Sequence, residues 1–103
     1  MLELTVGIGG FGAIGAKVAR ALDLNGLNGG MPGIKLVAIS ARDHDGARER
    51  MRDMTNPPPV VGLAELAGLA DVVVECAPAA VFAEVAEAAV EAGRIFIPLS
   101  CGA

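Results

Sequence analysis

The sequence predicts an α/β fold in which a doubly wound parallel sheet of about five strands carries helices on both faces. Short apolar runs alternate with segments of helical periodicity, the pattern that right-handed βαβ crossovers produce. The composition agrees, because 53% of the 103 residues are hydrophobic and only 3% are aromatic, as expected for strands covered on both faces. The expected strand order is 3-2-1-4-5, and the length fits one domain, residues 1–103.

The first strand and the first helix have the clearest patterns. Residues 2–9 alternate large apolar side chains with smaller or polar ones, which predicts a strand. Residues 13–24 carry apolar side chains at four-residue spacing, which predicts an amphipathic helix. A loop rich in glycine and asparagine, residues 25–33, leads to a second strand at residues 34–39.

The middle of the chain predicts shorter elements. Residues 43–54 show helical spacing with Asp43 as a candidate N-cap, although Gly46 lies inside this helix. Prolines at positions 57–59 stop any helix before them, because each lacks an N–H and disfavours helical geometry in the residue ahead. A short third strand is expected at residues 60–61.

The last third of the chain repeats the alternation of helix and strand. A short helix is expected at residues 63–69. Residues 71–76 contain three consecutive valines, a β-branched run typical of a central parallel strand. The alanine-rich residues 79–92 predict a helix that ends at Gly93, and residues 95–99 predict the fifth strand.

Charge and hydropathy exclude several classes of partner. The net charge of −4 gives no reason to expect a nucleic acid or an anionic membrane as a partner. No apolar run reaches the roughly 20 residues needed to cross a bilayer, and no basic leader precedes the first strand, so we expect a cytoplasmic protein. Cys76 and Cys101 are too few for a disulfide scaffold and are expected to be reduced, packed thiols, the alternative being a redox or metal pair.

Glycines after the first strand form the main candidate site. Two overlapping registers of the G-x-G-x-x-G pattern can be read, namely Gly7, Gly9 and Gly12, or Gly10, Gly12 and Gly15. The second register fits better, because its first glycine falls at the strand end and its third inside the first helical turn. Following a strand and opening a helix, this motif indicates a Rossmann-type site that holds the pyrophosphate of NAD or NADP at a helix N-terminus. The alternative is a turn with a structural role alone.

The end of the second strand decides which nucleotide is preferred. NAD-selective folds place an acidic residue there for the adenosine ribose, whereas NADP needs hydroxyl and cationic groups for its 2′-phosphate. The chain offers Ser40 and Arg42 for a phosphate, while Asp43 can serve a ribose if the turn is longer. In the alternative interpretation, Arg42 is a solvated surface charge and Asp43 is a helix cap.

Small residues follow the fourth and fifth predicted strands. Residues 76–80 and 100–102 are expected at the carboxyl edge of the sheet, where ligands of open α/β sheets bind. Close packing alone would also explain them. His44 is expected in an exposed helical turn, and Glu75 is expected to lie near the site or to bind neighbouring backbone. No nucleophile, base and orienting group can be assembled, so we expect no catalytic residue and no metal site in these 103 residues.

Three segments together resemble the N-terminal domain of L-aspartate dehydrogenase: residues 6–15 (VGIGGFGAIG), residues 74–81 (VECAPAAV) and residues 97–103 (IPLSCGA). The resemblance implies an enzyme that converts L-aspartate to iminoaspartate or oxaloacetate plus ammonia with NAD or NADP as hydride acceptor, and that can supply NAD biosynthesis. It also implies that the catalytic histidine and the substrate-binding residues belong to a C-terminal domain absent from this chain. A homodimer of the full-length protein is expected through that domain.

The same resemblance assigns cofactor-binding residues. The pyrophosphate would be bound by Gly10, Phe11, Gly12, Ala13 and Ile14. The adenosine end would be bound by Ser40 and Arg42, and the nicotinamide side by Ala77, Pro78, Ala79, Ser100 and Cys101. Ala41 stands where many members have an acid, so strict NAD use is not expected. The alternatives are the cofactor domain of another amino-acid or sugar dehydrogenase, such as a homoserine or inositol dehydrogenase, and a free-standing NAD(P)-binding module.

Overall fold

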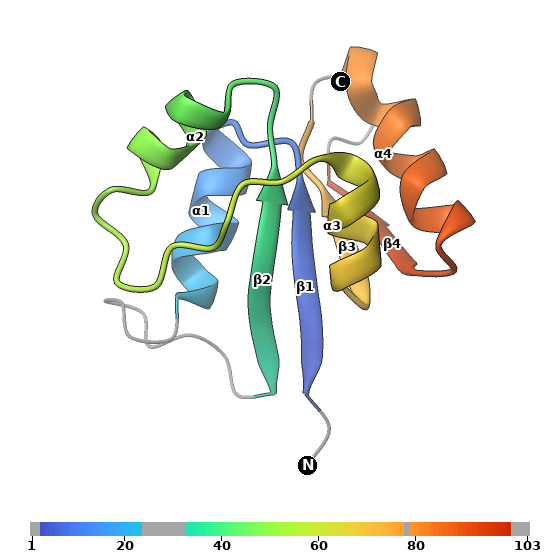
Figure 1. Cartoon of the computed structure of the whole chain (residues 1–103), viewed down its shortest axis with the longest axis horizontal. Coiled ribbons are helices and arrows are strands. Elements are labelled where there is room, and N and C mark those ends of the chain that lie inside the picture. The colour runs from blue at the N-terminus through green and yellow to red at the C-terminus, as the bar shows by residue number, and fades with distance from the viewer. Residues whose placement is uncertain (1–2, 24–32, 78, 100–103) are drawn as a thin grey trace.

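The computed structural model describes residues 3–23, 33–77 and 79–99. In these segments strands and helices alternate as predicted, except that the helices at residues 44–50 and 63–69 follow each other with no strand between them. The elements are, in order, β1 (Leu4–Gly9), α1 (Ala13–Leu22), β2 (Ile34–Ser40), α2 (His44–Arg50), α3 (Leu63–Leu69), β3 (Val72–Glu75), α4 (Ala79–Glu91) and β4 (Ile95–Pro98). The α/β class and the doubly wound parallel sheet are therefore confirmed (Figure 1).

The described sheet has four strands rather than five, in the order β2-β1-β3-β4, and all neighbours are parallel. The strand predicted at residues 60–61 is reduced to a single bridge between Ile39 and Val60 on the outer side of β2. It stays this short because the prolines before it lack N–H donors and Gly62 caps α3 directly after it. The bridge lies where order 3-2-1-4-5 puts the third strand, so the order is right and the strand count is wrong.

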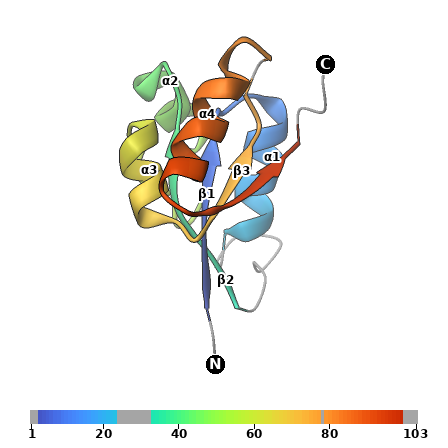
Figure 2. The same ribbon diagram turned by 90° about the vertical axis from the view of Figure 1, so that its right-hand side faces the viewer.

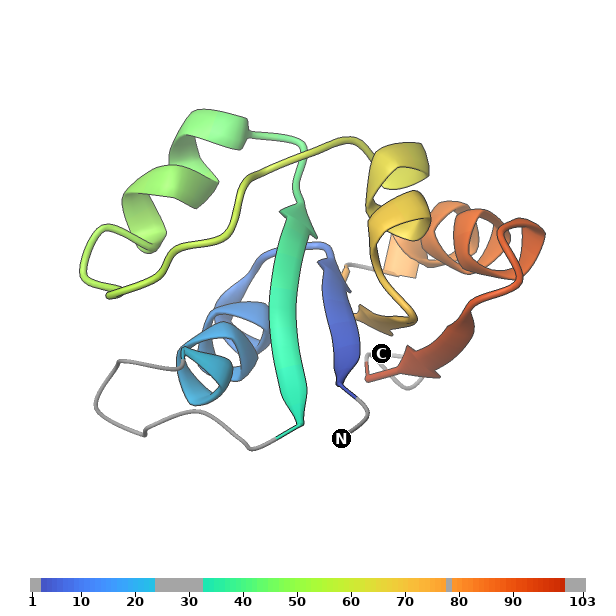
Figure 3. The same cartoon turned by 60° about the horizontal axis from the view of Figure 1, so that its bottom comes forward.

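The sheet separates two helical layers. One face is covered by α1, which packs on β1 and β2, and the other by α3 and α4 (Figure 2). Seen from the bottom of Figure 1, α1 and α3 lie on either side of the pair β1 and β2 (Figure 3). Side chains alternate accordingly along β1, so that Val6 and Ile8 belong to clusters with α1, while Gly7 and Gly9 face α3 and α4.

The helix predicted at residues 43–54 is shorter than expected. It ends at Arg50, and residues 51–53 continue as turns in which the Met51 N–H bonds to the Ala47 carbonyl at 3.2 Å. Met51 and Met54 are buried with Phe11, Ala19 and Ile39. The segment that follows α2 thus packs both methionines into the core beside α1.

The outer strand β4 is covered on one face only. Phe96 packs edge-to-face on Phe82 of α4, with ring centroids 5.7 Å apart. Ile95 and Ile97 point to the other face and are exposed, because α1 packs on β1 and β2 instead. None of the helices in the described segments is long and apolar enough to cross a membrane.

Candidate functional site

The predicted site residues meet where β2, β1 and β3 end together. Gly9 pairs with Ser40 on one side and with Glu75 on the other, so the three strands end level. The Gly10 N–H donates to the Ser40 carbonyl at 2.8 Å, and the Cys76 N–H donates to the Gly9 carbonyl at 2.9 Å. The arrowheads of β1 and β2 in Figure 1 mark this edge, at which the chain enters α1.

Gly10 makes the turn between β1 and α1. Its φ of 90° lies in the left-handed region, which residues with a side chain rarely adopt. A Cβ atom at this position would lie 2.5 Å from the Ala77 Cα atom. Both the backbone conformation and the close approach of the β3 end therefore require glycine at position 10.

Gly12 lies on the open side of the same turn. It is the N-cap of α1, in extended geometry and without a side-chain cap. A Cβ atom here would meet no other atom within 4 Å, and the residue is exposed. Because the first intrahelical bond runs from the Ala16 N–H to the Gly12 carbonyl, the N–H groups of the first turn have no acceptor within α1. The open side of the turn thus presents backbone donors and the positive end of the helix dipole.

Gly15 closes the turn from inside the first turn of α1. It is buried, and a Cβ atom there would lie 3.0 Å from the Gly10 carbonyl oxygen and 3.5 Å from the Cys76 Cβ atom. Gly7 and Gly9 lie in β1. The positions that the second register predicts for Gly10 and Gly15 are those found in the structure.

Phe11 and Ile14 occupy different environments in this turn. The Phe11 ring is buried among residues of α1, β2 and the segment after α2, while its carbonyl faces α2 and accepts a hydrogen bond from the Arg50 Nη1 atom at 3.0 Å. Ile14, in contrast, is 54% exposed on the first turn of α1. Phe11 therefore anchors the turn, while Ile14 leaves an exposed apolar side chain on the first turn of α1.

The end of β2 places Ser40 and Arg42 differently. Ser40 is buried, 7% exposed, next to the glycine turn, whereas the Arg42 side chain is exposed. Asp43 is the N-cap of α2, and its Oδ1 atom accepts a hydrogen bond from the Gly46 N–H at 2.9 Å. His44 is exposed at the start of α2, as expected. Asp43 is thus a helix cap and Arg42 is exposed, as the alternative interpretation predicts.

The end of β3 holds a buried carboxylate and a half-buried thiol. Glu75 has no exposed surface, and its Oε2 atom accepts a hydrogen bond from the Ala77 N–H at 2.8 Å, the backbone contact expected for it. Burial and the neighbouring Glu75 charge raise the pKa of the Cys76 thiol to about 11. Ala77 is buried against Gly10. The segment after β3 thus packs against the glycine turn through Ala77.

Three of the predicted cofactor residues, Pro78, Ser100 and Cys101, lie outside the described residues. Ala79 is the first residue of α4. In the described part of the chain, no three side chains of the metal-ligating types come together.

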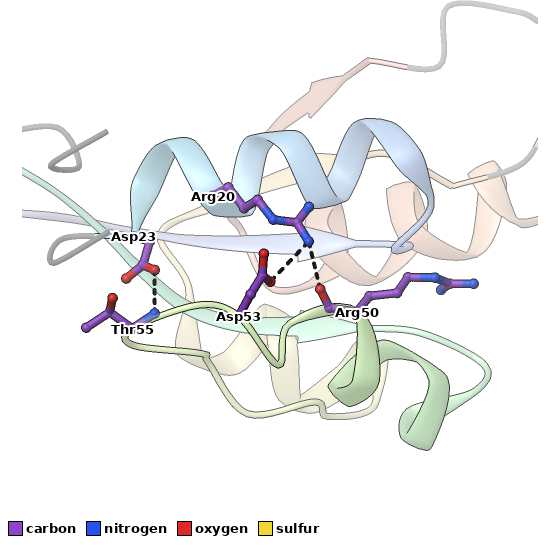
Figure 4. Close-up of polar contacts among 5 residues, drawn as sticks. All are labelled: Arg20, Asp23, Arg50, Asp53 and Thr55. Atoms are coloured by element: carbon purple, nitrogen blue, oxygen red, sulfur yellow. Dashed lines mark hydrogen bonds and ion pairs between the residues drawn. The ribbon is translucent and has the colours of Figure 1, made fainter. Parts of the chain in front are cut away.

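A polar seam that the sequence did not reveal joins α1 to the segment after α2 (Figure 4). Arg20 donates to the Arg50 carbonyl at 2.8 Å and to Asp53 at 3.3 Å, and its hydrogen bond lowers the pKa of Asp53. The buried Asp23 carboxylate accepts the backbone N–H groups of residues 55–56 at 2.8 and 3.0 Å. The run of arginines in α2 was the only sequence signal, and it did not distinguish Arg50 from its neighbours.

A doubly wound parallel sheet whose glycine turn opens on a helix N-terminus at the carboxyl edge defines a dinucleotide-binding domain of the Rossmann type. Sequence comparison makes this more specific. The chain belongs to the family described as homoserine dehydrogenase, NAD binding domain, whose profile matches residues 10–103.

Curated relatives confirm the resemblance to L-aspartate dehydrogenase. The chain is 42% identical over 101 residues to L-aspartate dehydrogenase 3 of Bordetella bronchiseptica, a match that covers 98% of this chain and 36% of the relative. It is 36% identical over 100 residues to the L-aspartate dehydrogenase of Bradyrhizobium diazoefficiens, which covers 97% of this chain and 34% of the relative. The chain therefore spans about a third of the length of these relatives.

Solved structures agree on the fold. The myo-inositol dehydrogenase of Lactobacillus casei, solved with NAD(H) and myo-inositol, superposes with a TM-score of 0.78 at 21% identity and covers 94% of this chain and 28% of that one. A probable dehydrogenase from Thermotoga maritima gives a TM-score of 0.74 at 24% identity, covering 92% and 27%. At these identities the likeness concerns the fold alone.

Proposed function

We propose that this chain is the cofactor-binding domain of an NAD(P)-dependent L-aspartate dehydrogenase, which converts L-aspartate to iminoaspartate or oxaloacetate plus ammonia. The observation that carries the proposal is the open position at Gly12, beside the N-terminus of α1, in a chain that is 42% identical to an L-aspartate dehydrogenase. A pyrophosphate needs both the space and the backbone donors that this turn offers.

The residues of the turn have the properties that a dinucleotide requires. We assign the pyrophosphate to Gly10, Phe11, Gly12, Ala13 and Ile14. The open side of Gly12 leaves room for the phosphates, and the exposed Ile14 leaves an apolar surface beside them. Gly10 packs on Ala77 and keeps the conformation of the turn, so that it contributes to binding through the backbone alone.

The two ends of the cofactor are assigned to neighbouring strand ends. Ser40 and Arg42 follow β2 and are proposed to bind the adenosine end, with the exposed Arg42 facing the 2′-phosphate of NADP. The nicotinamide side is assigned to the residues after β3 and β4, namely Ala77, Pro78, Ala79, Ser100 and Cys101.

When bound, the nicotinamide ring supplies the hydride acceptor of the reaction. The chain's own residues bind and orient the cofactor, and we assign the proton transfers and the recognition of L-aspartate to the part of the enzyme beyond these residues. We further propose that the complete enzyme is a cytoplasmic homodimer that can supply NAD biosynthesis.

A second candidate is the cofactor domain of a homoserine dehydrogenase, which the description of the matching family favours. The two readings share the same fold and the same glycine turn. They differ in the amino acid that is oxidised, so a substrate assay distinguishes them.

Two measurements test the proposal. Calorimetric titration of the 103-residue chain with NADP and with NAD is expected to give saturable binding of one nucleotide to one chain. The complete gene product is expected to reduce NAD or NADP with L-aspartate and not with L-homoserine, whereas the 103-residue chain alone is expected to give no turnover. Absence of nucleotide binding, or turnover with L-homoserine instead, would contradict the assignment.

A further inference from the structure

The side chain of Arg50 connects α2 to the glycine turn. Its Nη1 atom donates to the Phe11 carbonyl at 3.0 Å, in a partly buried contact between residues 39 positions apart. Arg50 is the last residue of α2, and Phe11 is the second residue of the turn after β1. The contact therefore joins the glycine turn, which follows β1, to α2, which follows β2.

The backbone of Arg50 is itself fixed by α1. Arg20 donates to the Arg50 carbonyl at 2.8 Å, and the next residue, Met51, is buried in the same cluster as the Phe11 ring. Figure 4 shows the Arg50 side chain running along α1 toward the N-terminal end of that helix. Both ends of the Arg50 to Phe11 contact are thus anchored in packed structure.

The contact between Arg50 and the Phe11 carbonyl also determines the direction in which the Gly12 N–H points. The described residues contain no cis peptide, and in a planar trans peptide the carbonyl and the N–H point to opposite sides. Because the Phe11 carbonyl faces Arg50, the N–H of Gly12 in the same peptide faces away from Arg50. The orientation of one backbone donor on the open side of the turn is therefore set by a side chain on α2.

We propose that Arg50 is a positioning residue for the cofactor pyrophosphate, which holds the peptide between Phe11 and Gly12 in the orientation that the phosphates bind. The inference rests on the proposed function, and it adds a residue that the glycine motif does not contain. Arg50 acts on the part that NAD and NADP share, whereas Arg42 is assigned to the 2′-phosphate that only NADP carries. The two arginines should therefore differ in selectivity.

The test compares Arg50→Met with Arg48→Met in the 103-residue chain. Both arginines are exposed residues of α2 and both changes remove one positive charge, but Arg48 pairs with Asp45 at 3.1 Å instead of reaching the turn. Affinities for NAD, NADP and ADP are measured by calorimetry. Arg50→Met is expected to weaken all three by roughly tenfold, the loss of one hydrogen bond from a charged donor. Arg50→Lys should recover part of the loss, and Arg48→Met should stay within about twofold of wild type.

A second readout does not depend on nucleotide. In ¹⁵N-labelled protein without ligand, the Gly12 amide resonance is expected to move in Arg50→Met and to stay in place in Arg48→Met, with the other resonances reporting that the fold is retained. If Arg50→Met does not fold, Arg50→Gln takes its place under the same criteria. Glutamine keeps a polar group at the end of the side chain, but this side chain is too short to reach the Phe11 carbonyl as the guanidinium does.

The outcomes separate this proposal from the proposed function. Binding of nucleotide by wild type with unchanged affinities in Arg50→Met overturns the positioning role alone. A loss confined to NADP also overturns it, since Arg50 would then read the 2′-phosphate. If wild type binds none of the three nucleotides, both proposals fail together.

Discussion

Gly10 and Gly12 stand two positions apart, and the structure uses the absence of a side chain differently at each. At Gly10 the backbone has a positive φ and packs on Ala77, so the residue serves the fold. At Gly12 the surroundings are open, so a side chain costs the fold little and fills the space in which we place the pyrophosphate. Substitution can therefore separate folding from binding within a single turn.

Gly12→Val is expected to abolish binding of NAD and NADP while the chain stays folded, because the valine occupies the space assigned to the phosphates at a position where a Cβ atom meets no neighbour within 4 Å. Gly10→Ala is the matched change, and it should lower the free energy of unfolding by roughly 1–3 kcal/mol or more through strain at positive φ and contact with Ala77. Urea unfolding and calorimetric titration of both variants make the measurement. Unchanged nucleotide affinity in Gly12→Val would show that the ligand does not enter here.

The choice of nucleotide is expected to depend on positions 41 and 42. If Arg42 donates charge-assisted hydrogen bonds to the 2′-phosphate, each contributes roughly 1.5–3 kcal/mol, and the exposure of this side chain favours the lower end of that range. NADP should therefore bind at least as well as NAD. Arg42→Ala should weaken NADP and spare NAD, and Ala41→Asp should shift the preference toward NAD by adding a ribose acceptor and repelling the phosphate.

Titration of wild type and both variants with the two nucleotides measures this, and raised salt should reduce the NADP advantage. Equal losses of NAD and NADP affinity in Arg42→Ala would mean that the arginine does not read the phosphate.

Cys76 is expected to be an unreactive thiol in the folded chain. Its pKa is raised from 9.0 to about 11 by burial and by the Glu75 charge, so at pH 8 the thiolate needed for alkylation is scarce. The folded state favours the neutral form, and between pH 9 and 11 the unfolded chain ionises first. The contribution of this group to stability is present below pH 9 and is lost as the pH rises through 11.

Iodoacetamide alkylation at pH 8 should therefore be slow and should accelerate in urea. Cys76→Ala should remove the part of the loss of stability above pH 9 that this thiol causes. Rapid alkylation of Cys76 in the folded chain would contradict the raised pKa.

At the scale of secondary structure, the sequence pattern predicted eight of the elements to within a few residues, because each has a local cause. The valines at positions 72–74 make a strand that both faces of the sheet bury, and the glycine turn separates β1 from α1. The strand at residues 60–61 was predicted on composition, but prolines on one side and the start of α3 on the other leave it a single bridge. A strand at residues 60–61 would need hydrogen-bond partners on β2, and the local sequence pattern does not show how many of these bonds can form.

The contacts around the site were harder to predict than its glycines. The spacing of the motif identifies Gly10, Gly12 and Gly15, since their roles follow from the backbone of one turn. Arg50 and Asp23 act on residues more than 30 positions away, and exposed arginines or acidic residues are common on helices. Only packing of α2 and the following segment against α1 gives these two side chains their partners.

Asp23 is expected to stabilise the connection between α1 and the segment after α2. Its buried carboxylate accepts two backbone N–H groups, from Thr55 and Asn56. Asp23→Ala should lower the free energy of unfolding by roughly 2–4 kcal/mol, because two donors lose a charged acceptor. Asp53→Ala is the control, since its ion pair with Arg20 is exposed and should contribute less than about 1 kcal/mol. Equal, small effects of both changes in urea unfolding would show that solvent replaces Asp23.

At the scale of the whole molecule, the two halves of the sheet have different tasks. The strands β2, β1 and β3 end at one edge and bring together the turn, Ser40 and the Glu75 segment. The outer strand β4 completes the sheet, with Phe96 buried against α4 and Ile95 exposed on its other face. The residues to which we assign the cofactor thus lie at one edge of the described domain, and we expect nucleotide binding to be coupled to the stability of the entire domain.

Nucleotide should therefore raise the melting temperature of the 103-residue chain. A ligand that binds only the folded state stabilises it by RT ln(1 + [L]/Kd), about 2.7 kcal/mol at a concentration of 100 Kd. For a domain of roughly 100 residues, each kcal/mol corresponds to about 4–8 °C, so the midpoint should rise by roughly 10–20 °C. Differential scanning calorimetry with NADP and NAD measures the shift, and Gly12→Val, which keeps the fold, should show none. A rise of equal size in Gly12→Val would mean that the nucleotide stabilises the chain from a surface other than the glycine turn.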